Sequence, residues 1–256
     1  MKKILSICRR DFTSYFNSPI AYIVIAIFLF IAGNIFWMAY SNFGNTYRMY
    51  SQYPWAKEDL TLAQMVFRPF FMILSNILLF MIPIITMKLV SEEKKLGTFE
   101  FLFTSPVTIP HIIFGKFLAA ASFVIIMLLT TAVYPLLLAI YGKPDLKMIA
   151  SGYLGLLVLS LAFIALGLFA SSLTENQIIA AIISFSILML FWVINWGSRN
   201  IQNPKIADIL NYLSIPDHFV DFTKGVIDTQ HIFFFLSIIA LGLFLTGIVI
   251  QSQRWR

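Results

Sequence analysis

The sequence has little charge and almost no cysteine. Asp, Glu, Lys and Arg make up 12% of the 256 residues, against about 25% in an average soluble domain. Apolar residues account for 59% and the mean hydropathy is +0.85, so the chain has too little polar surface to cover a water-soluble globule. The one cysteine, Cys8, excludes an intrachain disulfide and a CxxC metal site. These absences indicate an integral membrane protein.

Motifs for catalysis and nucleotide binding are also missing. The sequence contains no GxxxxGK[ST] phosphate loop, no HExxH and no GxSxG. The three histidines, His111, His218 and His231, are isolated in the sequence, and we interpret His111 and His218 as interfacial or hydrogen-bonded structural residues. The sequence therefore predicts no catalytic residue, no cofactor-binding residue and no metal ligand, which places a membrane enzyme last among the function classes.

Charge is absent from the middle of every long apolar run. A charged side chain there costs at least about 2.5–3.5 kcal/mol, and those that occur usually mark ion or proton pathways. This absence disfavours a secondary carrier or a channel. If the chain moves a solute, the free energy must come from another polypeptide.

Six continuous apolar runs are each long enough to cross a bilayer as a helix, which needs about 20 residues. They predict an all-α membrane protein with a single domain over residues 1–256. Three pairs of small residues, Gly167/Ser171, Ala180/Ser184 and Gly242/Thr246, have the spacing that allows close helix approach. The predicted spans are residues 20–40, 70–90, 117–141, 149–173, 178–196 and 232–250.

The basic residues lie at the ends of these runs. A net charge of +6 therefore indicates anchoring at a lipid surface and membrane topology, not nucleic-acid binding. Residues 1–18 have helical apolar spacing and predict an amphipathic interfacial helix, with Arg9 and Arg10 toward water and Phe12 and Phe16 on the apolar side. The basic residues near the start and the even number of spans predict that both termini are cytoplasmic.

The cytoplasmic stretch 91–116 contains the most informative pattern. Charged residues continue the second span, Gly97 and Thr98 interrupt it, and an aromatic-rich short helix follows. This helix either rests on lipid headgroups or fits a groove on a cytoplasmic partner, and the acidic residues beside it favour the partner. The predicted contact residues are Glu92, Glu93, Gly97, Thr98, Phe99, Glu100, Leu102 and Phe103.

The external stretch 197–231 has helical signals of its own. Ser214 and Asp217 have the spacing of a capping box, and an apolar stripe that includes Phe219 and Phe222 follows. We expect this segment to dip toward the bilayer. Its candidate functional residues are Ser214, Asp217, His218, Phe219 and Phe222.

Four segments resemble one family in the same order along the chain. They read FTSYFNSPIAYIVIAIFLFIAG, EEKKLGTFEFLFTSPVTIPHIIFGKF, FASSLTENQIIAA and SIPDHFVDFTKGVID. Together they resemble the ABC-2-type transporter permeases over nearly the whole chain, most of all the gliding-motility permease GldF and the NosY-type permeases. In the third segment, Thr174 and Gln177 fit a capping box.

The resemblance implies a six-span subunit of the bacterial cytoplasmic (inner) membrane that pairs with a second permease copy or a paralogue. Separate ATPase subunits would bind the ATP and Mg, so this chain would need no cofactor. The segment from Glu92 to Phe103 would be the coupling helix. Gliding-type systems also suggest a GldG-like accessory membrane protein with a large external domain. A second ATPase contact would comprise Thr174, Glu175, Asn176 and Gln177.

Two functions fit this resemblance. The chain is either the permease of an ATP-driven exporter or a non-transporting membrane anchor that transmits force to an accessory external protein. A continuous polar or amphipathic path between the paired subunits would indicate transport, and a closed seam would indicate mechanical transmission.

Overall fold

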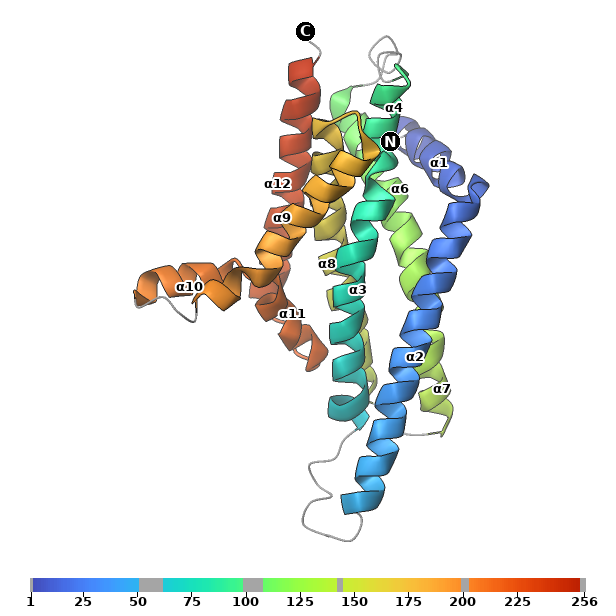
Figure 1. Ribbon diagram of the computed structural model, residues 1–256, viewed down its shortest axis with the longest axis vertical. Helices are drawn as coiled ribbons and strands as arrows, with labels where there is room; N and C mark the ends of the chain where they lie inside the picture. The colour runs from blue at the N-terminus through green and yellow to red at the C-terminus, as the bar shows by residue number, and fades with distance from the viewer. Residues whose placement is uncertain (1, 51–61, 99–107, 142–144, 199–202, 254–256) are drawn as a thin grey trace.

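A computed structural model describes residues 2–50, 62–98, 108–141, 145–198 and 203–253 (Figure 1). All regular structure in these ranges is helical, and six helical stretches are long and apolar enough to cross a membrane. The predicted all-α fold with six spans is therefore confirmed. The elements are α1 (Lys2–Asn17), α2 (Pro19–Tyr50), the π-helical turn η2 (Ala63–Phe67), α3 (Arg68–Thr86), α4 (Lys88–Lys95), α6 (Ile109–Thr131), α7 (Val133–Tyr141), α8 (Leu146–Leu173), α9 (Gln177–Ser198), α10 (Pro204–Tyr212), α11 (Ile215–Thr223) and α12 (Thr229–Gln253).

The helices extend beyond the predicted spans. Helix α2 continues to Tyr50, and α6 begins at Ile109 instead of residue 117. Pro110 lies in the first turn of α6, where its missing N–H has no helical partner to lose. Lys116, which lies just before the predicted third span, is therefore part of α6.

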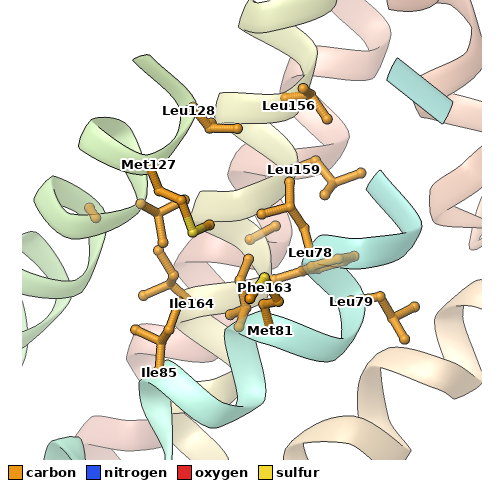
Figure 2. Close-up of a cluster of buried hydrophobic side chains, with 14 of the residues drawn as sticks. Leu78, Leu79, Met81, Ile85, Met127, Leu128, Leu156, Leu159, Phe163 and Ile164 are labelled. Atoms are coloured by element: carbon orange, nitrogen blue, oxygen red, sulfur yellow. The ribbon is translucent and has the colours of Figure 1, made fainter. Parts of the chain in front are cut away.

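Helix α8 forms the centre of the molecule. It is apolar on all sides and packs against α3, α6, α9, α11 and α12, as a helix surrounded by other helices must. Figure 2 shows the core where α3, α6 and α8 meet. The labelled side chains are Leu78, Leu79, Met81 and Ile85 of α3, Met127 and Leu128 of α6, and Leu156, Leu159, Phe163 and Ile164 of α8.

Small residues bring the helices around α8 close to it. A Cβ at Gly167 would lie 2.8 Å from Thr86 Cβ of α3, and a Cβ at Gly242 of α12 would lie 2.9 Å from the Ala165 carbonyl. The close helix approach that the sequence predicts is thus confirmed at Gly167 and at Gly242. Both ends of the chain lie at the same end of the molecule as α4, as an even number of spans requires (Figure 1).

The segment before α12 forms two helices. Helix α11 packs against α8 and α3, with Phe219 and Phe222 buried, so this part of the segment lies among the spanning helices (Figure 1). The predicted capping box is wrong in its bonding. Ser214 precedes α11, but its hydroxyl forms no capping hydrogen bond with the first turn of the helix.

Candidate functional site

The second span is interrupted where α3 passes into α4, at Met87. Ser171 of α8 bonds to the backbone at this junction. Its Oγ accepts from the N–H of Val90 at 3.1 Å and of Ser91 at 3.2 Å, and it donates to the Met87 carbonyl at 2.9 Å. The polar groups at the helix break are therefore satisfied by another helix, and α8 sets the position of α4.

Four charged residues join α1, α4 and α6. The Lys116 ammonium lies 2.8 Å from Glu93 Oε2 and 3.3 Å from Asp11 Oδ2, and its side chain is 2% exposed. The Arg10 guanidinium lies 2.6 Å from Glu93 Oε1 and 2.8 Å from Asp11 Oδ1. Two cations and two anions balance, as buried charge requires. We call Arg10, Asp11, Glu93 and Lys116 the ion-pair cluster.

Helix α1 is docked on the protein through aromatic and apolar contacts. The Tyr15 hydroxyl donates to the Ile85 carbonyl at 2.9 Å, and the rings of Tyr15 and Phe16 lie 5.2 Å and 5.7 Å from that of Phe123 in α6. Burial, together with the nearby carboxylates of Asp11 and Glu92, raises the pKa of Tyr15, so the phenol stays protonated. Phe12 packs on Phe16, and Arg9 is exposed.

Gly97 ends α4 as the sequence predicts. Its φ of +68° is the left-handed conformation that glycine adopts without strain. The Leu96 N–H donates to the Glu92 carbonyl, and the Thr98 hydroxyl donates to the Glu93 carbonyl at 3.2 Å. The remaining residues of the predicted coupling helix, Phe99, Glu100, Leu102 and Phe103, lie outside the described residues.

The α8–α9 turn has a different cap from the predicted one. Asn176 Oδ1 accepts from the Ile178 N–H at 2.9 Å, while Thr174 Oγ1 accepts from the Asn176 N–H at 3.2 Å. Thr174 is the extended residue that ends α8, so Asn176 caps α9, and the predicted Thr174/Gln177 capping box is wrong. Glu175 lies between these two residues and is exposed.

The end of α4 and the α8–α9 turn lie side by side. The Lys94 ammonium donates to the Ser172 carbonyl. An open cavity of about 390 Å³ separates the two segments. The structure thus brings together two segments that the sequence analysis assigned separately to an ATPase contact. The cavity is lined by Lys94, Leu173, Thr174, Glu175, Asn176 and Gln253.

The arrangement consists of hydrogen bonds and ion pairs that hold helices together. Within the described ranges, no three His, Cys, Asp or Glu side chains gather to hold a metal ion. Residues 5–252 match the family model described as ABC-2 family transporter protein. The chain belongs to the ABC-2 transporter family. No curated protein matches it.

As an ABC-2 family protein, the chain is the non-catalytic membrane permease subunit of a transporter. Permeases of this family pair with ATPase subunits, which bind the ATP and Mg. The predictions of a membrane permease and of a chain without catalytic activity are both confirmed by the family match.

The ABC-2 permease also has a histidine pair that the sequence analysis treats as isolated residues. His218 Nδ1 of α11 lies 2.7 Å from His231 Nδ1 of α12, and His218 Nε2 donates to the Tyr212 carbonyl at 2.8 Å. His231 Nε2 lies 3.0 Å from Asp221 Oδ2. The ring of His218 stacks on Phe234 at 3.8 Å. This network joins α10, α11 and α12, while Asp217 is exposed.

The stability of this network is expected to fall in acid. Burial, with the neighbouring His231, holds the pKa of His218 below its ordinary value of 6.5, against the opposing effect of the Tyr212 carbonyl. In acid, the unfolded chain therefore binds more protons at His218 than the folded chain does. The contribution of neutral His218 to the free energy of unfolding is complete above about pH 6.5 and is lost as the pH falls through the pKa of His218 in the folded protein. The melting temperature measured between pH 7.5 and 5.5 should show this decrease. A His218→Gln variant should show a weaker one, and an equal decrease in both proteins would contradict the prediction.

Proposed function

We propose that the ATPase subunit docks on the surface formed by the end of α4 and the α8–α9 turn, and that both termini lie on the same cytoplasmic side. The observation that carries this proposal is the adjacency of Lys94 and Asn176 around one open cavity. A single partner surface can therefore contact both segments at once. The surface is polar and exposed at Glu175, as a docking site in water should be.

The same geometry supports transmission of force into the membrane. Helix α4 is tied to α8 through Ser171, to α6 through Lys116 and to α1 through Arg10. A displacement at the end of α4 therefore reaches three other helices through short contacts. We propose that ATP-driven movement enters the permease here and is passed to the second and third spans.

The proposed complex contains a second permease copy or a paralogue. Helices α2 and α9 support this, because large apolar side chains such as Phe30, Trp37 and Leu190 are exposed along them and must face lipid or protein. A GldG-like accessory membrane protein, as in gliding-type systems, would complete the assembly.

Site-directed cross-linking tests the docking surface. In a Cys8→Ser background, Asn176→Cys and Leu96→Cys are each expected to form a cross-link with the ATPase subunit of the same transporter, because both positions are exposed beside the α4 end. Tyr47→Cys is the matched control, since Tyr47 is exposed near the far end of α2 (Figure 1). Cross-linking that is equal at all three positions, or absent at the first two, would refute the proposed surface.

Gly97→Val is expected to uncouple the complex. A side chain at φ +68° is strained by about 1–2 kcal/mol, so the chain that leaves α4 should take another path. The packing of the spanning helices should not change. Stimulation of the ATPase by the permease should decrease, and the melting temperature should change little. Gly44→Val is the control, because a Cβ at Gly44 in α2 meets no neighbouring atom within 4 Å. Normal stimulation by the Gly97→Val permease would contradict the coupling role.

A further inference from the structure

A second cavity, of about 500 Å³, lies between α1, α2, the α3–α4 junction and α6. Its walls differ from one end to the other. Near α4 the lining is charged, and near the start of α2 it is apolar. The charged part comprises Arg10, Asp11, Lys88, Glu92, Glu93 and Lys116, and the apolar part includes Ala21, Val24, Ile84 and Phe123.

Two charges in this lining are left over after the ion-pair cluster is formed. Among the described residues, neither the Lys88 ammonium nor the Glu92 carboxylate has an ion-pair partner, although both side chains are partly buried. Partly buried charge without a partner is costly. The six charged residues of the lining sum to zero, so the cavity favours neither an anion nor a cation alone. It suits a ligand that carries one group of each sign.

The apolar end of the cavity indicates that the rest of such a ligand is hydrocarbon. Ile84 is 47% exposed and lies two turns before Glu92, a rise of roughly 12 Å along the helix. Val24 faces the same cavity from the first spanning helix. The charged end therefore lies where a predicted span leaves the bilayer, and the apolar end continues along its lipid-exposed helices. A molecule with a zwitterionic head and hydrocarbon tails matches both ends.

We propose that this cavity binds a membrane phospholipid with a phosphoethanolamine headgroup. Its phosphate pairs with Lys88 and with the half-exposed guanidinium of Arg10, and its primary ammonium donates to Glu92. The acyl chains leave the cavity past Val24 and Ile84. The bound lipid joins α1 and α2 to α4. The inference does not depend on the ATPase contact, because it concerns lipid bound to the permease alone.

Native mass spectrometry of the detergent-purified chain tests this site. Phosphatidylethanolamine, phosphatidylcholine and phosphatidylglycerol with identical acyl chains are added in equal amounts. The phosphatidylethanolamine adduct should predominate, because a quaternary ammonium cannot donate a hydrogen bond and phosphatidylglycerol has no cation. Lys88→Gln and Glu92→Gln should each lower its retention about tenfold, as the loss of one charge-assisted hydrogen bond predicts.

Lys95→Gln is the matched control, because Lys95 is an exposed lysine of the same helix outside the cavity, and it should retain the lipid. Soluble phosphoethanolamine, which lacks acyl chains, should not displace the lipid. Equal retention of the three lipids, equal loss in the Lys88 and Lys95 variants, or displacement by the soluble headgroup would each overturn the proposal. The comparison of the three lipids on the unmodified chain decides the outcome even if a variant fails to fold.

Discussion

Lys116→Met is expected to lower the stability of the folded permease by about 3 kcal/mol, as the removal of one partner from a buried ion pair does. The substitution keeps most of the side-chain volume but leaves Asp11 and Glu93 without their shared cation. Their side chains are only 13% and 19% exposed, so water screens the remaining repulsion poorly. Arg10 still pairs with both carboxylates, which holds the loss near the lower end of the range for such pairs.

The chain contains its own probe for this effect. Cys8 is on α1, beside Ser122 of α6, and burial raises the pKa of its thiol and so slows its reaction with maleimide. When α1 loses its anchor to α6 in the Lys116→Met protein, Cys8 should react faster and the melting temperature should fall. Adding Glu93→Gln should recover part of the stability. Lys95→Met, which changes an exposed lysine of α4, should alter neither measurement, and a Lys116→Met protein that behaves like it would show that the ion-pair cluster contributes little.

The six spans could be predicted from the sequence because length and apolarity alone decide whether a helix crosses a bilayer. The residues at which those spans begin and end could not be predicted in this way. Lys116 lies outside the predicted third span, since its charge is costly in an apolar helix unless it is paired. Its partners Asp11 and Glu93 are distant in the sequence, and only the folded chain brings them to the same point.

The candidate site could likewise be predicted only in part, because some of its features depend on contacts between segments that are distant in the sequence. Gly97 ends α4 because glycine adopts a positive φ without strain, and the residue type alone indicates this. The cap at Asn176 and the His218–His231 pair depend on where neighbouring backbone runs, and a spacing rule selects the wrong residue or none. The side-by-side position of α4 and the α8–α9 turn results from Ser171 bonding to the α3–α4 junction, which no local pattern indicates.

The second large effect is expected at Gly242, where α12 lies against α8. In Gly242→Val, the new Cβ would lie 2.9 Å from both the carbonyl carbon and the carbonyl oxygen of Ala165, and 3.1 Å from its Cβ. The two carbonyl atoms belong to the backbone of a buried helix, so they cannot rotate away as a flexible side chain can. The two helices must separate, and overpacking of this kind costs about 3 kcal/mol. The melting temperature of the purified protein should fall accordingly.

Alanine substitutions on α12 separate this clash from the ordinary effect of replacing glycine. Alanine favours a helix over glycine by about 1 kcal/mol, so Gly247→Ala, whose Cβ would lie 3.6 Å from Ile113, should leave the protein as stable or make it more stable. Gly242→Ala should destabilise it, because contact with the Ala165 backbone outweighs the gain in helix propensity. The same chemical change, five residues apart on one helix, should thus have opposite effects on the melting temperature. Equal effects would mean that α8 and α12 are not in the close contact that holds this side of the permease together.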